Sequence, residues 1–334
     1  MLAAIGAGGP VEEVAYATTL ATNVMLEGRG SPVALYSYAG RVELTQIAAP
    51  GLASPDDPLE ALVPRDLRFD VPGWMNEHGR EVEPLGLIPD LTGGVAAAVV
   101  LYDSDANSDA ADEQAVAAVL RRRGVEVTVS SEIPSESAEY ERTIATVVNA
   151  SLLGPCRPSL LRLADVAERV MIVTSAGSLI TLEEAARRPV SLLHSSAAGG
   201  VLAASAAAEA AGFPDAVTLD MGGTSTDVCL IIGGRPSLSS QHRVADLPIG
   251  LPSLDVRTIG AGGGSIVRID DKGVLVVGPE SAGADPGPAC YGRGGTRPTV
   301  TDANLVAGRF PAYPQLLGRA HIVEVYRLSR CDRD

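Results

Sequence analysis

Three short apolar runs between residues 216 and 240 are separated by glycine-containing turns. The runs AVTLDM and DVCLII flank the turn GGTST, and Gly233-Gly234 precedes a third, shorter run. Runs of this length that are bounded by turn residues are typical of strands joined as hairpins. The pattern therefore predicts a three-stranded meander of consecutive hairpins.

Upstream of this region, strand and helix patterns alternate. Gly94–Tyr102 is a continuous apolar run, Asp109–Arg123 has apolar residues at helical spacing, and VEVTVSS after Gly124 has a strand pattern. This order predicts a right-handed crossover unit in a parallel or mixed sheet. A further helix is predicted over Tyr140–Pro155. Residues 45–95 are rich in proline and poor in periodicity, which predicts an irregular insertion.

Shorter elements are predicted from the signals at their ends. Hydroxyl and amide residues from Thr18 onward favour a helix to about Glu27, and SPVALYSYAG then favours a strand. A strand over Arg169–Thr174 precedes a short helix, for which Thr181 and Glu184 form a capping box.

Composition and charge exclude several classes of function. The 334 residues include 41 acidic and 26 basic side chains, a net charge of −15, so sequence-independent binding to nucleic acid or anionic membranes is not expected. The four cysteines are far apart, without a CxxC pair, which favours isolated reduced thiols over a zinc site or a disulfide framework. With no basic leader and no apolar run of roughly 18 residues, we expect a cytoplasmic protein of about two domains.

The first turn of the meander carries more polar chemistry than a hairpin requires. Gly222 and Gly223 would supply residues with positive φ. The turn also holds three hydroxyl side chains between two carboxylates, namely Thr224, Ser225, Thr226, Asp220 and Asp227. A phosphoryl group would use these groups, because glycines expose backbone N–H donors, hydroxyls add donors, and a carboxylate can hold Mg²⁺ through water. The alternative is an ordinary hairpin turn, in which Gly-Gly before Thr and Ser is common.

A second candidate anion site precedes an alanine-rich helix that ends near Ala211. The segment HSSAAGG includes Ser195, Gly199 and Gly200, and a glycine-containing loop at a helix N-terminus can bind an anion. Alternatively, these small residues only allow the helix to pack closely on a sheet.

Two further glycine-rich stretches follow the meander. GAGGGSI includes Gly262, Gly263, Gly264 and Ser265, and its four glycines indicate close backbone approach to a ligand or to a neighbouring strand. The hairpin VRIDDKGVLVV comes next.

The segment after that hairpin is a long polar loop up to about Asn304. Loops of this length in compact domains are usually functional. Cys290 lies in it without a neighbouring base, which favours a structural thiol over a nucleophile. A final helix is predicted to begin at Ala303, capped by Thr301 or Asp302.

Three of these stretches together resemble the hydantoinase/oxoprolinase family. They are DMGGTSTDV, GAGGGSI and AGADPGPACYGRGGT. VAYATTLATN is similar to the family segment HGTTVATN, although Tyr16 and Ala17 stand where the family has His and Gly, and EYERTIATVVNASL is similar to EYERTSTTVVNAYL. The resemblance extends from about Val14 to about Gly308. The family includes ATP-dependent hydantoinases, 5-oxoprolinases and the β-type subunits of acetone carboxylases.

The resemblance implies an α/β fold of the actin-like ATPase (ribonuclease H-like) class, with a two-domain architecture that is incomplete at both ends. Residues 1–155 would form the N-terminal domain, residues 168–318 the ATPase domain, and residues 319–334 an unrelated tail. The family's first phosphate motif, D-x-GGTFTD, has no counterpart here.

The chemistry implied by the resemblance is ATP-dependent opening of a cyclic amide or imide, of the hydantoin or 5-oxoproline type. Asp220 would hold Mg²⁺ and Asp227 would orient the turn or bind the metal. The residues Gly222 to Thr226 would bind phosphate, and Gly262 to Ser265 would lie against the nucleotide. A B-type partner subunit and an oligomeric assembly are also implied. The alternatives are an ATP-using subunit of an acetone-type carboxylase and an inactive fragment that acts at most as a binding module.

Overall fold

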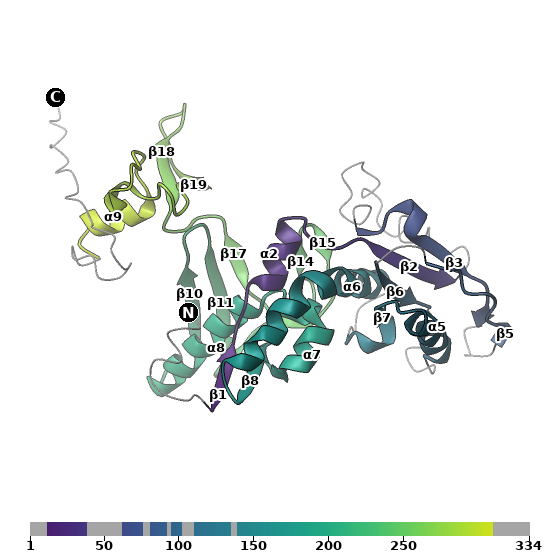
Figure 1. The fold of residues 1–334 in the computed structure, drawn as a ribbon. Coiled ribbons are helices and arrows are strands. Elements are labelled where there is room, and N and C mark those ends of the chain that lie inside the picture. The colour runs from purple at the N-terminus through teal and green to yellow at the C-terminus, as the bar shows by residue number, and fades with distance from the viewer. Residues whose placement is uncertain are drawn as a thin grey trace, which may run out of the picture. The chain divides into compact units, whose positions relative to one another are not determined.

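A computed structural model describes residues 12–38, 62–75, 81–91, 95–101, 110–134 and 139–309 (Figure 1). The chain divides into two units. The first comprises Met1–Leu202 with Leu238–Leu254, and the second comprises Ala203–Ser237 with Asp255–Asp334. The family-domain limits given above, 1–155 and 168–318, stay a prediction, and the tail at 319–334 lies outside the described residues.

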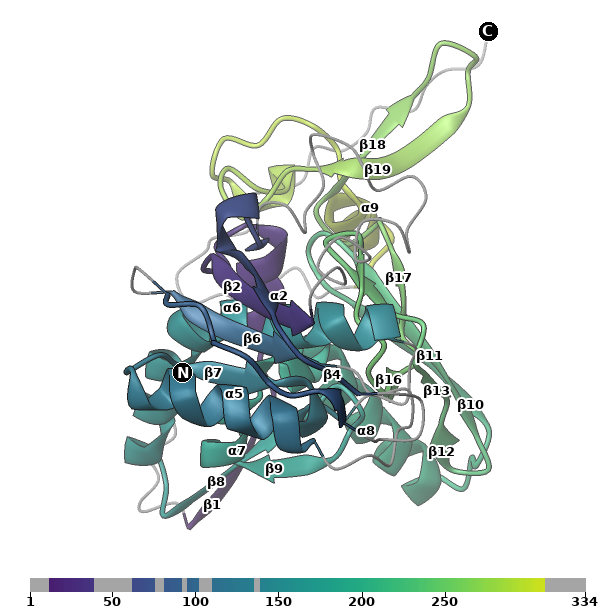
Figure 2. The ribbon, with the colours of Figure 1, turned by 90° about the vertical axis from the view of Figure 1, so that its right-hand side faces the viewer.

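The first unit is built on a parallel sheet with the strand order β3-β2-β6-β7 (Figure 2). Its strands are β2 (Val33–Tyr38), β3 (Arg68–Val71), β6 (Ala96–Val100) and β7 (Val127–Val129). Helix α5 (Ala111–Arg122) buries Val116 and Leu120 against one face, where Tyr36 and Val99 lie. Helix α6 (Glu139–Leu161) packs on the other face. Because alternate residues of a strand point to opposite faces, both faces of β2 are apolar, and the predicted α/β crossover is confirmed.

The prediction of an irregular insertion over residues 45–95 is wrong where the chain forms β3. This strand pairs with β2 at the sheet edge, and Phe69 stacks on Tyr36 with 4.8 Å between the ring centroids. The strand has the sequence RFDV, and an alternation of polar and apolar residues over only four positions does not stand out in a proline-rich stretch. The region also contains η2 (Arg65–Leu67), β4 (Trp74–Met75) and β5 (Glu81–Glu83). Residues 45–61, 76–80 and 92–94 lie outside the described part.

Helix α6 continues beyond its predicted end at Pro155. It runs to Leu161 and contains Pro155 and Pro158, because buried residues at four-residue spacing, Cys156 and Leu160, extend its apolar stripe. A proline in a helix leaves the carbonyl four residues earlier without its usual partner. For Pro155 that carbonyl belongs to Ser151, and it accepts a hydrogen bond of 3.0 Å from the N–H of Ser31.

Smaller elements complete the first unit. Strands β1 (Glu13–Tyr16), β8 (Arg169–Val173) and β9 (Leu179–Thr181) form a sheet in the order β1-β8-β9. The predicted first helix is α2 (Leu20–Leu26), and the predicted short helix is α7 (Leu182–Arg187), whose N-cap hydroxyl of Thr181 accepts from the N–H of Glu184. The remaining elements are η3 (Ser130–Glu132), η4 (Arg162–Asp165), η5 (Pro189–Leu192), β13 (Leu238–Ser239), β14 (Arg243–Val244), β15 (Leu247–Pro248) and β16 (Ser253–Leu254).

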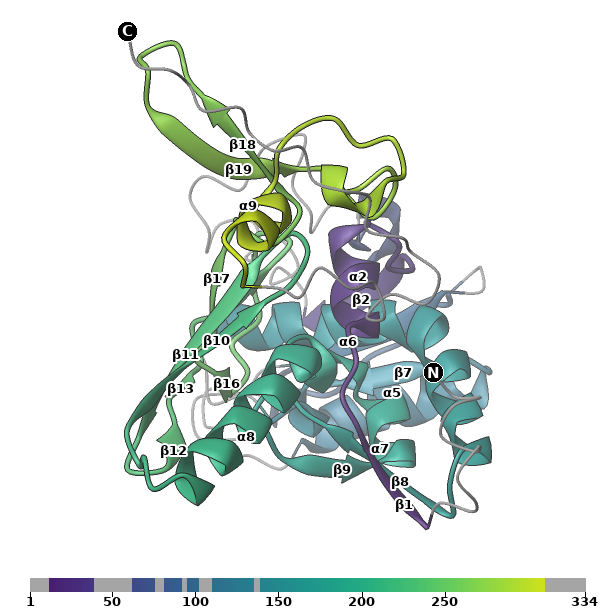
Figure 3. The ribbon, with the colours of Figure 1, turned by 90° about the vertical axis from the view of Figure 1, so that its left-hand side faces the viewer.

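The second unit contains the predicted meander, which is confirmed (Figure 3). Strands β10 (Ala216–Met221), β11 (Thr226–Ile232) and β12 (Arg235–Pro236) are antiparallel, and β17 (Arg257–Ile259) also pairs with β11. Helix α8 (Ser195–Ala210) is tied to the second turn by a hydrogen bond from the hydroxyl of Ser205 to the carbonyl of Gly234. The unit also contains the hairpin β18 (Ser265–Ile269) and β19 (Leu275–Ser281), then η6 (Ala289–Tyr291) and α9 (Val300–Val306).

A helix that spans a membrane must be both long and apolar. Within the described ranges, no helix is both long and apolar enough to cross a lipid bilayer.

Candidate functional site: the Gly222–Thr226 turn

The turn that joins β10 to β11 is closed by one backbone hydrogen bond. The N–H of Gly222 donates to the carbonyl of Ser225 at 2.9 Å. The strands pair Met221 with Thr226 and, one step further from the turn, Asp220 with Asp227. The structure therefore places both carboxylates at the base of the turn, on adjacent strands.

The two turns of the meander use glycine for different reasons. Gly233 and Gly234 have φ values of +57° and +75°, which glycine adopts more readily than other residues. Gly222 and Gly223 are not in that region, so the expectation of positive φ at this turn is wrong. A Cβ built on Gly223 would meet no described atom within 4 Å. Neither the backbone conformation nor crowding from the described residues requires glycine at position 223.

The glycine-rich loop packs directly behind this turn. The N–H groups of Gly263 and Gly264 donate to the carbonyls of Gly222 and Gly223 at 2.8 and 2.6 Å. A Cβ on Gly262 would lie 2.7 Å from the backbone nitrogen of Ser225, so this glycine is required for close backbone contact. The structure thus brings together the two predicted groups of site residues, the turn 222–226 and the glycine-rich stretch 262–265.

The glycine-rich loop supports the turn and is itself held in place by Ser265. The N–H of Gly262 donates to the hydroxyl of Ser265 at 2.8 Å, and Ser265 is fully buried. Because the donors of Gly262, Gly263 and Gly264 already have protein acceptors, we assign this loop to holding the turn. Its predicted contact with the nucleotide stays a prediction.

The three hydroxyl side chains of the turn lie in different environments. Thr226 is buried and its hydroxyl donates to the carbonyl of Ala261 at 2.6 Å. Thr224 is exposed and Ser225 is partly exposed. Thr226 therefore anchors the turn, whereas Thr224 and Ser225 remain accessible to a ligand.

The carboxylates of Asp220 and Asp227 lie on one face, because residues paired directly across antiparallel strands point to the same side. Like charges in this position repel each other. The hydroxyl of Thr258, on β17, donates to Asp227 Oδ1 at 2.7 Å, while Asp220 is exposed. Within the described ranges no cluster of three or more His, Cys, Asp or Glu could hold a metal. Two carboxylates still fit Mg²⁺, which keeps several waters and commonly takes one or two carboxylates together with substrate phosphates.

The second predicted anion site is not a loop. Ser195 begins α8, and Gly199 and Gly200 lie inside the helix. The buried hydroxyl of Ser195 accepts a hydrogen bond from the N–H of Thr18 at 3.0 Å. A Cβ on Gly199 would lie 2.7 Å from Cβ of Ala17, so the packing alternative is correct for this glycine.

The long loop before α9 is organised by Asp302. Its carboxylate accepts from the N–H of Cys290 at 2.7 Å and from the N–H and hydroxyl of Thr299, both at 2.8 Å. Thr299 and Asp302 form a capping box, so α9 begins at Val300 and not at Ala303 as predicted.

The electrostatics of this loop agree with a structural role for Cys290. Burial raises the pKa of Asp302, but the hydrogen bonds from Cys290 and Thr299 outweigh it and leave the pKa below its ordinary value. Burial, with the neighbouring Asp302, raises the pKa of the Cys290 thiol to about 12. A thiol that stays protonated at neutral pH is a poor nucleophile.

One buried carboxylate was not found by reading the sequence. Glu113 on α5 is buried and accepts from the N–H groups of Leu101 and Ser131 at 3.0 and 2.9 Å. The sequence does indicate that this glutamate faces the core, because position 113 lies three and seven residues before Val116 and Leu120, on the same side of the helix. It joins α5 to the ends of β6 and β7, which is a structural role.

The fold and the site define an α/β protein with a candidate phosphate-binding turn between two carboxylates. Comparison with known families gives a match to the hydantoinase/oxoprolinase description over residues 142–320, and to the N-terminal region of the same family over residues 2–124. The chain therefore belongs to the hydantoinase/oxoprolinase family, which confirms the resemblance.

Individual relatives support the same placement. Caprolactamase subunit alpha of Pseudomonas jessenii is 35% identical over 87% of this chain and 45% of its own length. Acetophenone carboxylase gamma subunit of Aromatoleum aromaticum is 30% identical over 89% of this chain and 45% of its own length. The crystal structure of ATP-dependent caprolactamase from P. jessenii superposes with a TM-score of 0.73 at 32% identity, covering 92% of this chain and 47% of that one. The chain thus spans about half the length of these relatives.

Proposed function

We propose that this chain carries the ATP site of an enzyme that opens a cyclic amide or imide, of the hydantoin or 5-oxoproline type. The observation that carries the proposal is the Gly222-Gly223 turn, because neither its backbone conformation nor the described residues around it require glycine at position 223. A glycine here leaves room for a phosphate to approach the backbone N–H groups. The relative named ATP-dependent caprolactamase supports both the nucleotide and the class of substrate.

In this proposal each part of the turn has a separate task. Backbone N–H groups of the turn and the hydroxyls of Thr224 and Ser225 bind the terminal phosphates. Asp220 holds Mg²⁺ through water, and Asp227, oriented by Thr258, orients the turn or shares the metal. Bound Mg²⁺ would neutralise phosphate charge and relieve the repulsion between the two carboxylates. Gly222 and Thr226 fix the geometry of the turn.

The chemistry follows from the stability of a ring amide. Transfer of the γ-phosphoryl group to the amide oxygen gives ADP and makes the ring carbon electrophilic. Water then attacks that carbon, and the ring C–N bond breaks as the nitrogen takes up a proton, which leaves an acyl phosphate. A second water hydrolyses the acyl phosphate to the carboxylate and inorganic phosphate. The protein contributes by positioning the reactants and by stabilising charge.

The test is nucleotide binding by the chain, followed by ATP hydrolysis. We expect isothermal titration with ATP and Mg²⁺ to give a binding isotherm, and Asp220→Ala to weaken Mg²⁺-dependent binding by about tenfold or more. Arg169→Ala is a matched control, since Arg169 forms an exposed ion pair with Glu13 in the first unit. An Asp220→Ala protein that binds Mg·ATP as well as the parent would overturn the proposal.

The same assays distinguish two alternative functions. Activation of a ketone for carboxylation is supported by the likeness to acetophenone carboxylase gamma subunit. ATP hydrolysis stimulated by acetone with bicarbonate, and not by hydantoin, 5-oxoproline or caprolactam, would favour it. An absence of heat with Mg·ATP would favour the inactive binding module.

We also propose an actin-like ATPase fold, a B-type partner subunit, oligomeric assembly and a cytoplasmic location. The relatives named as alpha and gamma subunits support a partner. Co-expression with a B-type chain followed by size-exclusion chromatography tests the assembly, because a stable complex would elute ahead of either chain.

A further inference from the structure

A cavity of about 850 Å³ lies within the first unit, beside β7. It is lined by the C-terminal end of α5, by β7 and η3, and by residues of α6 and α7. Its volume is within the range of small-molecule sites. It shares no lining residue with the proposed nucleotide site, so it calls for a different ligand.

The cavity lining carries one more positive than negative side chain, although the protein as a whole is acidic. Its lining includes three glutamates and four arginines, Arg121, Arg157, Arg187 and Arg188, while the whole chain has a net charge of −15. Arginine remains protonated at all physiological pH values, so the excess positive charge is permanent. An anion is the complementary ligand.

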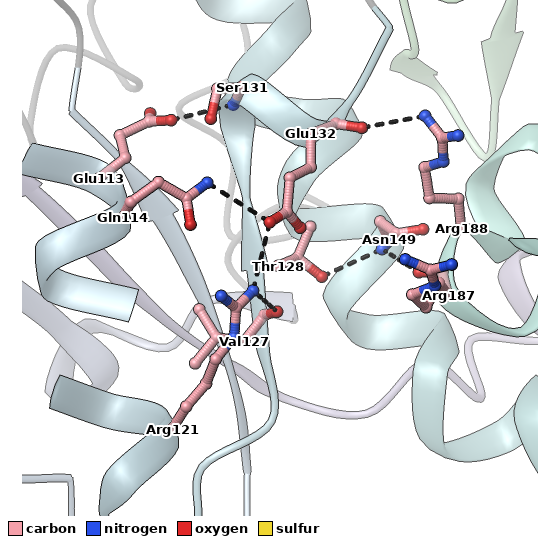
Figure 4. A network of polar contacts seen from close by, with 10 residues as sticks. All are labelled: Glu113, Gln114, Arg121, Val127, Thr128, Ser131, Glu132, Asn149, Arg187 and Arg188. Carbon is pink, nitrogen blue, oxygen red and sulfur yellow. Dashed lines mark hydrogen bonds and ion pairs between the residues drawn. The ribbon is translucent and has the colours of Figure 1, made fainter. Parts of the chain in front are cut away.

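Two of the arginines keep donor groups for a ligand. Glu184 forms ion pairs with both Arg188 and Arg187. Its distance to Arg187 is 3.3 Å, and the side chain of Arg187 is 72% exposed. Among the described residues, Arg121 contacts the carboxylate of Glu132 and the carbonyl of Val127, both at the long distance of 3.4 Å (Figure 4). A guanidinium has five N–H donors in a planar fork that matches a carboxylate.

Arg121 and Arg187 lie on separate helices, and a hydrogen-bonded pair of side chains lies between them. Figure 4 shows Thr128 and Asn149 between Arg121 of α5 and Arg187 of α7. The buried side chain of Asn149 donates to the hydroxyl of Thr128 at 3.0 Å and to the carbonyl of Arg187 at 3.1 Å. It also accepts from the N–H of Val190 at 3.2 Å. The backbone at Arg187 is thereby fixed before any ligand binds.

The lining also has an apolar component. Ile133 and Leu153 are both buried and both line the cavity. A short hydrocarbon segment would contact such side chains favourably, whereas an inorganic anion would gain nothing from them. Two separate arginines and an apolar wall together fit an anion with two charged ends and a short carbon chain.

We propose that this cavity binds a small aliphatic dicarboxylate, with one carboxylate on Arg121, the other on Arg187, and the carbon chain against Ile133 and Leu153. Each carboxylate accepts hydrogen bonds from one guanidinium fork. Asn149 acts as a positioning residue, because it holds the backbone of Arg187 and does not need to touch the ligand. The site is independent of the proposed nucleotide turn.

The experiment is isothermal titration of the full chain with succinate at constant ionic strength. Butyrate, with the same number of carbons and one carboxylate, and inorganic phosphate are the comparison ligands. The variants are Arg121→Gln and Arg187→Gln, with Arg169→Gln as an exposed arginine outside the cavity. Thermal unfolding of each variant confirms that it is folded.

We expect succinate to bind the parent at least about tenfold more tightly than butyrate or phosphate, and each cavity variant to lose about tenfold. Arg169→Gln and Asp220→Ala should bind succinate as the parent does, so failure of the nucleotide proposal would leave this one intact. No binding of succinate, equal binding by Arg187→Gln, or equal binding of phosphate would overturn it.

Discussion

Glycine is used for two different reasons on the two sides of the Gly222–Thr226 turn. Gly262 allows backbone to pack on backbone, since a Cβ there would lie 2.7 Å from the nitrogen of Ser225. A Cβ on Gly223 would have no atom of the described residues within 4 Å. A methyl group should therefore cost folding energy at one position and ligand affinity at the other.

We expect Gly262→Ala to lower the free energy of unfolding by about 1–3 kcal/mol, because the loop or the turn must shift. Gly223→Ala should change it by less than about 0.5 kcal/mol while weakening Mg·ATP binding by about tenfold or more. Urea denaturation and titration with a fluorescent ATP analogue measure the two effects. A Gly223→Ala protein with parental nucleotide affinity would show that nothing approaches this side of the turn.

Asp302 links the stability of the second unit to pH. Its hydrogen bonds from Cys290 and Thr299 lower the pKa of the folded carboxyl below its unfolded value. A carboxyl with a lowered folded pKa contributes stability above its unfolded pKa of about 4, and this contribution is lost as the pH falls through the folded pKa. Acid should therefore weaken the end of the long loop.

Asp302→Asn tests this contribution. At pH 7 we expect the free energy of unfolding of the variant to be about 1–3 kcal/mol lower than that of the parent, because an amide cannot accept all the hydrogen bonds that the carboxylate accepts. The difference from the parent should shrink below about pH 4. Denaturation curves between pH 7 and pH 3 measure it, and a difference that stays constant over that range would contradict the linkage.

Helix α6 shows how packing overrides local preference. Pro155 and Pro158 both disfavour a helix, yet the helix continues because Cys156 and Leu160 are buried on its apolar stripe. The carbonyl released by Pro155 bonds to Ser31. Pro158 is exposed, so its ring contributes little packing in return for the missing hydrogen bond.

Pro158→Ala should therefore stabilise the protein. We expect about 1–2 kcal/mol, which is the helix penalty of proline reduced by the greater freedom of alanine in the unfolded chain. Pro252→Ala, at an exposed position outside helices and strands, is the matched control and should be neutral or slightly destabilising. Equilibrium urea unfolding compares the two, and a less stable Pro158→Ala protein would mean that the proline ring packs favourably.

Elements with a long or regular pattern could be predicted from the sequence. The apolar spacing of α5, the continuous run of β6 and the β10–β11 hairpin all gave the correct element, because each pattern is local. Strand β3 could not be recognised, since its polar–apolar alternation covers only four residues within a proline-rich stretch. The continuation of α6 past Pro155 could not be recognised either, because the burial of its last turns and the hydrogen bond from Ser31 depend on the fold.

The candidate site was predictable in composition but not in the contacts between its parts. The excess of hydroxyls and carboxylates around Gly222 is visible in the sequence. The hydrogen bonds from Gly263 and Gly264 to the turn are not, because they join segments about forty residues apart that only the fold brings together. Similarly, no local pattern distinguishes a glycine inside α8 that packs on Ala17 from one in an anion-binding loop.

The second unit has an exposed apolar sheet face. Val217, Leu219 and Met221 alternate along β10 and point to one side, and Leu230 lies directly opposite Val217 on β11. Val217 and Leu219 are 64% and 67% exposed. The pair of aspartates lies on the other face, because position 220 falls between 219 and 221. Contiguous apolar patches of this kind usually mark interaction surfaces or aggregation liabilities.

The net charge of −15 opposes association of two such faces, so salt concentration becomes the controlling variable. We expect the purified chain to associate more strongly as ionic strength rises, because screening removes the repulsion and leaves the apolar attraction. Leu219→Lys should reduce this association, whereas Leu87→Lys, at an exposed leucine of the first unit, should not. Sedimentation velocity at about 50 mM and about 500 mM salt would measure this association. Association that weakens with salt would show that charge pairing, and not the β10–β11 face, holds the copies together.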